Sequence, residues 1–497
     1  MKRMNMMVAV ALSAAAGWGY FPTATPESQG VDSTALRGWI DACEQELDAL
    51  HGFVLLRHGK LIAEGYWAPY AQDRTHMLYS HSKSFTSTAI GFLVDEGKLD
   101  LDERVATIFP DKLPEKPGEN LLRMRVRDLL TMNTGSEHDS IGPVNRAPDG
   151  DWVKAFLAHP VERQPGTHFV YNTGATYMLA AIVEKRTGEK LMDYLGRRFF
   201  QPLEITSAWT TTCPKGIACG GYGMNMTTRD LAAFGQFYLQ KGTWNGKPLL
   251  SEDWIALATA KETGTRRDPS SDWGCGYGFQ FWRCQPHGVY RADGARGQLT
   301  IVMPEQDAVL SVNAGLDDMQ KELTLVWRYV LPAFKDAPLA EAPAAQDLAQ
   351  RCARLALAPV KGEKDGLTAI LGTEFVYETN ALGITSIKLS AKDDGWEVGF
   401  TGPFGEQRIP VGFNAWKYGS VKLEKEAHEG LGALMGDQPT ASMGAWTAPG
   451  VFSVRTYLVG GPSRIDMTLK FTAATLTADV KFKAMRSPHH TFIGTAK

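Results

Sequence analysis

The sequence predicts an α+β fold, in which an antiparallel sheet flanked by helices is split by a helical insertion and followed by an all-β sandwich or small barrel. Hairpin patterns occur at residues 53–67 and 299–313, and the chain between them has mostly helical patterns. Alternating strand patterns follow an Ala- and Pro-rich stretch at residues 337–345. Helices packed on an antiparallel sheet are the simplest assembly of these elements. At 497 residues the chain is long enough for two or three domains.

The first helix is predicted from about Thr34 to Leu50, because Ser33 is a suitable N-cap and apolar residues follow at helical spacing. The spacing of apolar residues then changes to every second position at residues 53–56 and 61–67, on either side of a turn at His58-Gly59-Lys60. These two segments therefore predict a β-hairpin.

The second hairpin joins residues 299–303 and 308–313 through the turn at 304–307, and a helix is predicted from about 318 to 334. Three helices are predicted between the hairpins. They run from about 82 to 96, from about 175 to 186, and onward from Thr227, which begins a Thr-x-x-Asp helix start.

The C-terminal region reads as a short helix at 347–357 and then as β-strands. The strands are expected at 375–377, 384–389, 396–400, 455–459, 465–471 and 476–482. The expected organisation is a possible signal segment at 1–19, a main domain at 20–336 with its insertion at about 98–245, a linker and short helix at 337–365, and a β domain at 366–497.

The composition excludes several classes of protein. With 52 basic and 55 acidic residues, the formal charge of −3 provides no positive field for a nucleic acid. No run of 18 apolar residues occurs, so no transmembrane segment is expected. The sequence does not indicate an oligomeric state.

The N-terminus has the layout of a short secretory signal. Lys2 and Arg3 precede an apolar, Ala-rich run at 6–16, whereas Asn5 and the aromatic stretch at 18–21 are unusual for such a signal. We therefore expect a periplasmic or secreted protein, with a cytoplasmic location as the alternative.

The six cysteines do not form a disulfide scaffold. Cys213 with Cys219, or Cys275 with Cys284, could be paired in an exported protein, and buried free thiols are the alternative. Neither C-x-x-C nor H-E-x-x-H spacing is present, so we expect no metal site and no cofactor.

Ser80 and Lys83 stand three residues apart at the start of a predicted helix, so both project onto one face. A serine hydroxyl needs a base to become a nucleophile, and a lysine can be that base when burial lowers its pKa. The apolar residues that follow predict such burial. The alternative is that Ser80 caps the helix and Lys83 is solvated, since a lone S-x-x-K match also arises by chance.

Other serine chemistry is excluded. The chain has no G-x-S-x-G elbow. His81 is adjacent to Ser80 on the helix and points in a different direction, so it cannot serve as the base of a triad. We expect His81 to pack in the core or to line a substrate pocket.

Several motifs occur in a characteristic order. They are LYSHSKSFT at 78–86, GKLDLD at 97–102, VRDLLTMNTG at 126–135, FVYNTG at 169–174, GGYGM at 220–224 leading into TTRDL at 227–231, and GARGQ at 294–298. From about residue 26 to 334 the chain resembles the serine β-lactamase/penicillin-binding superfamily. Within it, the class C β-lactamase-related branch fits best, with family VIII esterases, D-amino peptidases and 6-aminohexanoate-dimer hydrolases.

The resemblance implies a β-lactamase/transpeptidase-like domain with Ser80 as the acylated nucleophile and Lys83 as its proton acceptor. Tyr171 would be a second proton-transfer group, because a tyrosine near an ammonium can ionise below its usual pKa of about 10. The backbone N–H groups of Ser80 and Ala295 would form the oxyanion hole.

Two departures from the family pattern affect substrate binding. The position of the family's Y-x-N asparagine is taken by Thr173, while Asn172 lies one residue earlier, and either could supply the polar contact. Ala292-Asp293-Gly294 replaces K-T-G, so the lysine that holds a substrate carboxylate is missing. Arg296 is the nearest replacement cation, or else a structural partner of Asp293.

The expected function is hydrolysis of a small carboxylic ester or amide through an acyl-enzyme. The alternatives are a β-lactamase, a D-amino peptidase or a cell-wall peptide hydrolase, with a peptide as the substrate. An alternative of another class is a non-catalytic sensor that keeps a vestigial site and recognises its ligand through the β domain.

Overall fold

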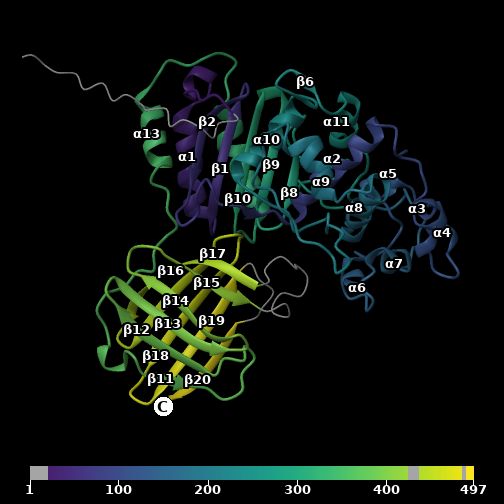
Figure 1. Ribbon diagram of the computed structural model, residues 1–497. Coiled ribbons are helices and arrows are strands. Elements are labelled where there is room, and N and C mark those ends of the chain that lie inside the picture. Colours follow the sequence, from purple (N-terminus) through teal and green to yellow (C-terminus); the bar gives the residue numbers. More distant parts are fainter. Residues whose placement is uncertain (1–20, 424–435, 484–488) are drawn as a thin grey trace, which may run out of the picture.

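The computed structural model describes residues 21–423, 436–483 and 489–497 (Figure 1). The possible signal segment at 1–19 lies outside the described residues. Within these ranges, no helix is long and apolar enough to cross a membrane.

The main sheet has six strands in the order β2-β1-β10-β9-β8-β7. The two predicted hairpins are neighbours in it, because β1 (Leu50–Arg57) pairs antiparallel with both β2 (Lys60–Tyr66) and β10 (Ala308–Ala314). The other three strands are β9 (Gln298–Met303), β8 (Tyr290–Gly294) and β7 (Trp282–Arg283). The prediction of an antiparallel sheet built from distant hairpins is confirmed.

Both faces of the sheet are covered, so every residue of β1, β9 and β10 is buried. Leu55 and Leu310 belong to a cluster with α1 (Ser33–Glu46) and α12 (Met319–Leu325). Val54 and Val309 belong to a second cluster with α2 (Ser82–Asp95) and α10 (Thr228–Leu239). Alternating side chains of each strand therefore supply two separate cores.

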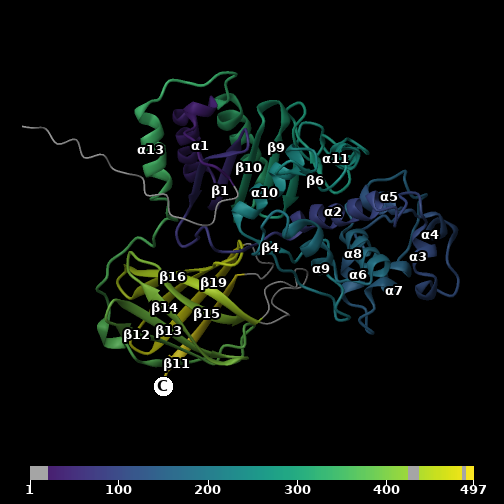
Figure 2. The same cartoon turned by 45° about the horizontal axis from the view of Figure 1, so that its top comes forward.

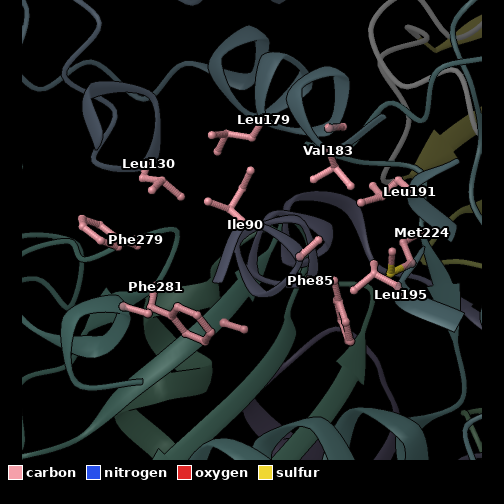
Figure 3. Close-up of a cluster of buried hydrophobic side chains, with 14 of the residues drawn as sticks. Phe85, Ile90, Leu130, Leu179, Val183, Leu191, Leu195, Met224, Phe279 and Phe281 are labelled. Atoms are coloured by element: carbon pink, nitrogen blue, oxygen red, sulfur yellow. The ribbon is translucent and has the colours of Figure 1, made fainter. Parts of the chain in front are cut away.

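The helical insertion packs around α2, of which all but the last two residues are buried. Figure 3 shows Phe85 and Ile90 of this helix among side chains of neighbouring helices. The neighbouring helices whose residues are labelled there are α5 (Val126–Leu130), α8 (Thr173–Thr187) and α9 (Leu191–Leu195). The other helices of this region are α3 (Val105–Ile108), α4 (Glu119–Arg123), α6 (Ile141–Asn145), α7 (Trp152–Leu157) and α11 (Glu252–Thr259). The insertion thus fixes the helix whose first turn carries Lys83.

Three predicted helix boundaries were wrong. Helix α1 is capped by the Asp32 side chain rather than by Ser33, and it ends at Glu46 because β1 takes the chain from Leu50. Helix α8 begins at Thr173, two residues earlier than expected. Helix α13 (Pro343–Cys352) begins inside the expected linker.

The helix expected at 318–334 is irregular. The α-helical part, α12, ends at Leu325, and a π-helical segment (Val326–Val330) and a 3₁₀ turn (Leu331–Ala333) follow. Pro332 lies in this last turn, where it cannot donate an intrahelical hydrogen bond.

The C-terminal region is a barrel, which settles the choice between a sandwich and a barrel. Strands β11 to β20 form one sheet, and a parallel bridge between Gly412 of β14 and Met443 of β16 closes it. The expected strands correspond to β11 (Glu374–Val376), β12 (Ser386–Lys392), β13 (Gly395–Gly402), β17 (Val451–Leu458), β18 (Arg464–Phe471) and β19 (Thr475–Lys483). The sequence missed β14 (Gly405–Gly412), β15 (Lys417–Leu423), β16 (Gly436–Ala448) and β20 (His490–Ala496).

The barrel lies beyond one end of the main sheet, with β16 and β17 toward it, while the helical insertion lies to the side (Figures 1 and 2). The contact is direct. Tyr70 donates a hydrogen bond of 2.8 Å from its hydroxyl to the carbonyl of Gly461, in the loop between β17 and β18. The short strand β3 (His76–Met77), which pairs with β4 (Asn225–Met226), also contacts this loop.

Candidate active site

Ser80 lies in a 3₁₀ turn (Tyr79–His81) that leads directly into α2. The Ser82 hydroxyl holds this turn, because it donates to the carbonyl of Tyr79 at 2.7 Å and accepts from the backbone N–H of Met224 at 3.1 Å. Lys83 follows in the first turn of α2 and is 1% exposed. The structure therefore brings Ser80 and Lys83 to one place, at the buried start of a core helix.

The Lys83 amine has three hydrogen-bond partners. Its Nζ lies 3.1 Å from Ser80 Oγ, 3.3 Å from Thr173 Oγ1 and 2.7 Å from the carbonyl oxygen of Gly221. Burial lowers the pKa of Lys83 to about 7, although the carboxylates of Asp139 and Asp293 oppose the shift. A lysine in this position is part neutral and part charged near neutral pH.

Tyr171 joins the same group. The Lys83 Nζ lies 4.9 Å from the centre of its ring. Trp282 stacks on the Tyr171 ring with the ring centres 5.6 Å apart. The expectation that the phenol ionises below about 10 was wrong, because burial raises its pKa well above that value, although the Ser80 side chain opposes the shift.

The two residues after Tyr171 have different positions. Asn172 is the N-cap of α8, where its side-chain oxygen accepts from the Ser140 hydroxyl at 2.7 Å and from the backbone N–H of Ala175 at 3.3 Å. Thr173 instead contacts the Lys83 amine through its hydroxyl. Of the two candidates for the polar contact, the structure places Thr173 at the amine and Asn172 at the helix cap.

The end of β8 lies against the Ser80 turn. A Cβ atom on Gly294 would lie 2.0 Å from the carbonyl oxygen of Leu78 and 3.1 Å from the backbone nitrogen of His81, so only glycine allows this approach. Ala295 follows and is exposed. The assignment of an oxyanion hole to the N–H groups of Ser80 and Ala295 stays a prediction.

The charged residues of this segment have separate partners. Asp293 is buried and accepts a hydrogen bond of 2.8 Å from Nε of Arg291. Arg296 is paired with Asp317. The structure therefore identifies Arg291, not Arg296, as the structural partner of Asp293.

His81 lies outside this group. Its ring is fully buried, with centres 5.8 Å from the Phe85 ring and 6.0 Å from the Phe234 ring. Burial lowers its pKa to about 3, so the ring is neutral at ordinary pH. His81 packs in the core.

Sequence reasoning missed three contributors to the site. Gly221 belongs to the GGYGM motif at 220–224, which was assigned no chemical role, yet its carbonyl is the shortest hydrogen-bond contact of Lys83. Asp139 accepts from the backbone N–H of Thr173 at 2.8 Å, and Trp282 supports Tyr171. No motif marks Asp139 or Trp282, because each reaches the site through tertiary folding.

Among the described residues, the cysteines and potential metal ligands form no second site. All six cysteines are free thiols in the structure. Within the described ranges, no group of three or more His, Cys, Asp and Glu side chains could hold a metal ion.

The chain is similar in sequence to two proteins that are named as hydrolases. The chain is 28% identical over 314 residues to a 6-aminohexanoate-dimer hydrolase of Paenarthrobacter ureafaciens, which covers 58% of this chain and 78% of the relative. It is also 28% identical over 167 residues to a putative D-alanyl-D-alanine carboxypeptidase of Escherichia coli, which covers 31% of this chain and 38% of that protein. The chain thus spans well under half of the second relative's length.

A solved structure extends the likeness of fold across the barrel. The octameric penicillin-binding protein homologue from Pyrococcus abyssi aligns with a TM-score of 0.50 and 16% identity, covering 93% of this chain and all of that one. The sequence profile described as Beta-lactamase matches residues 40–335, which is more than half of the chain. With the Ser80 turn, the buried Lys83 and the antiparallel sheet in place, this match shows that the chain belongs to the Beta-lactamase family.

Proposed function

We propose that the protein is a cofactor-free serine hydrolase that cleaves a small carboxylic ester or amide through an acyl-enzyme on Ser80. One observation carries this proposal: the amine of the buried Lys83 lies 3.1 Å from the Ser80 hydroxyl. A nucleophile and its base need this kind of direct contact.

The other partners of Lys83 support its role as the base. A neutral amine has two N–H bonds and one lone pair. The Gly221 carbonyl can only accept, and Thr173 Oγ1 offers a second acceptor, so both N–H bonds have partners. The lone pair is then left for the Ser80 hydroxyl, whose proton Lys83 takes as Oγ attacks the substrate carbonyl.

The phenol of Tyr171, which stays protonated, is suited to protonating the leaving group. As the tetrahedral intermediate collapses, Tyr171 gives its proton to the departing alcohol or amine, and Lys83 returns the proton from Ser80 to the phenol. A water molecule then hydrolyses the acyl-enzyme by the same steps in reverse. The N–H groups of Ser80 and Ala295 would stabilise the oxyanion, where loss of one donor costs about 100- to 1000-fold in rate.

Fluorophosphonate labelling tests the proposal directly. The wild-type protein should be labelled at Ser80 and should hydrolyse short p-nitrophenyl esters, whereas Ser80→Ala should do neither. Ser87→Ala is the matched control for a buried hydroxyl farther along α2, which bonds to the Phe279 carbonyl, and it should retain labelling at Ser80. A Ser80→Ala protein with full activity would contradict the proposal.

A second candidate is a β-lactamase, D-amino peptidase or cell-wall peptide hydrolase, which the likeness to the putative carboxypeptidase favours. The structure offers little support for a substrate carboxylate, because Ala292 replaces the family's lysine and Arg296 is already paired with Asp317. Turnover of nitrocefin or of D-alanyl peptides would promote this candidate. A burst of acylation without turnover would instead favour a sensor.

A further inference from the structure

The chain just before Ser80 lies between the main domain and the barrel. The backbone N–H of Leu78 donates to the carbonyl of Met224 at 2.9 Å, within the main domain. The N–H of Met77 donates in the other direction, to the carbonyl of Gly460 at 2.9 Å. Gly460 belongs to the hairpin loop 459–463 between β17 and β18, so the barrel directly holds the segment that leads to the proposed nucleophile.

Tyr79 is the residue that joins this segment to Ser80, and its backbone is unusual. Its φ is +49°, in the left-handed region that is unfavourable for a residue with a bulky side chain. Such a conformation persists only when its surroundings enforce it. The orientation of Ser80 therefore depends on whatever holds Tyr79.

Barrel side chains surround the Tyr79 ring, whereas the Ser82 hydroxyl of the main domain bonds to the Tyr79 carbonyl. The ring is 2% exposed and belongs to a cluster with Met77 of the main domain and four barrel residues. Those barrel residues are Val421, Leu458, Ile465 and Val480. The hairpin loop touches the main domain elsewhere too, because Tyr70 bonds to Gly461, and a Cβ on Gly315 would lie 2.9 Å from the carbonyl oxygen of Pro462.

We infer that the barrel is a positioning element of the active site, which holds Tyr79 in its left-handed conformation through Leu458, Ile465 and loop 459–463 and thereby aims the Ser80 hydroxyl. The contacts of Lys83 and Tyr171 among the described residues come from the main domain, where Lys83 lies in α2 and Tyr171 just before α8. The barrel therefore acts on the nucleophile and leaves its proton-transfer partners in place. This inference rests on the proposed role of Ser80.

Matched substitutions in the barrel separate positioning from stability. Leu458→Ala removes packing from Tyr79, and Leu389→Ala makes the same truncation in the barrel core, away from the main domain. Both leucines are fully buried. The two variants should lose similar stability, and only Leu458→Ala should change the reactivity of Ser80.

The readout is the rate of Ser80 labelling by a fluorophosphonate, resolved into kinact and KI, on samples shown to be folded by circular dichroism. Leu458→Ala should lower kinact at least tenfold with KI unchanged, because a misplacement of about 1 Å at a reacting group can cost roughly 100-fold. Leu389→Ala should stay within about twofold of wild type, as expected for a site far from the reacting groups. Equal kinact values for the two variants would overturn the inference.

Two further arms keep the result decisive. If either alanine variant does not fold, Ile465→Val and Ile387→Val remove one methylene from the same two clusters, and only the first should lower kinact. If wild-type protein is not labelled at Ser80, the proposed function fails first. If wild type is labelled but the paired variants do not differ, only the role of the barrel fails.

Discussion

Lys83 is the residue on which the proposed chemistry depends most. Its charged form would be stabilised by water in an exposed site, but here the amine is buried and has three hydrogen-bond partners. Because burial disfavours the charged form, the amine is available as a base near neutral pH.

Replacing Lys83 should stop acylation without unfolding the protein. Lys83→Met keeps a long side chain in the buried site and removes the base, so ester hydrolysis should fall by about 100-fold or more, the usual contribution of a positioned base. Initial rates with p-nitrophenyl esters measure this effect. Lys154→Met, at an exposed lysine, is the control and should retain wild-type activity. Equal activity in the two variants would remove Lys83 from the mechanism.

Tyr171→Phe tests the phenol separately from the ring. The stacking on Trp282 is retained and the proton donor is lost, so kcat should fall by about 100-fold. Substrates with a good leaving group, which need little protonation, should be affected less than substrates with a poor one. A uniform loss across leaving groups would indicate that the hydroxyl has only a structural role.

At the scale of elements, helix α8 places Thr173 through its N-cap. The Asn172 side chain accepts from the backbone N–H of Ala175 in the first turn of α8 and also binds Ser140, so Thr173 begins the helix beside Lys83. If α8 began one residue earlier or later, the Thr173 hydroxyl would lie on another face of the helix.

Removing this cap should affect stability. Asn172→Ala should cost about 1–2 kcal/mol, as for other lost caps, and should lower Tm in thermal unfolding followed by circular dichroism. Thr227→Ala removes the corresponding cap of α10 and is the comparison. Only Asn172→Ala should also lower activity, because α10 does not contact Lys83. An unchanged Tm would mean that Asn172 does not stabilise α8.

The sequence predicted the elements whose signals are local. The hairpin at His58-Gly59-Lys60 and the apolar periodicity of α2 were visible in short windows, and so was the Ser80/Lys83 pair. The motif order, by resemblance, also identified Tyr171 and the end of β8.

The rest depended on tertiary structure. Strand β14 pairs with its sequence neighbour β13, and β16 with its neighbour β17, but the bridge between β14 and β16 that closes the barrel joins non-consecutive strands, which no short window reveals. Asp139 and Trp282 reach the site from separate parts of the chain. The predicted direction of the Tyr171 pKa shift was wrong because the sequence does not give the extent of burial of its ring.

At the scale of the whole molecule, the two domains share buried side chains. The His51 ring stacks on Tyr70 with centres 3.7 Å apart, and its Nδ1 lies 3.0 Å from Nε2 of His76. Tyr457 of the barrel contacts both His51 and Tyr70. Burial lowers the pKa of His76 to about 4 and that of His51 well below its ordinary value.

These histidines should make the fold sensitive to acid. In the unfolded chain they bind protons below a pH of about 6.5, whereas in the folded chain His76 and His81 stay neutral down to pKa values of about 4 and 3. The contribution of these neutral histidines to the free energy of unfolding is therefore fully present above pH 6.5 and is lost as the pH falls below that value. At pH 5, His76 and His81 should each lower the free energy of unfolding by roughly 2 kcal/mol.

Urea unfolding at pH 7.5 and pH 5 measures this loss. His76→Gln should reduce the difference between the two midpoints, whereas His287→Gln, at an exposed histidine, should leave it unchanged. Equal midpoints at the two pH values for wild type would show that the buried histidines do not control acid stability.

The pH dependence of Ser80 labelling tests the central claim, that a buried Lys83 activates Ser80, most directly. Because the pKa of Lys83 is lowered to about 7, its neutral fraction and the rate of fluorophosphonate labelling should rise about tenfold between pH 6 and pH 8 and then level off. Lys83→Met should lose this step. A rate that keeps rising to pH 10, or one that does not depend on Lys83, would contradict the account.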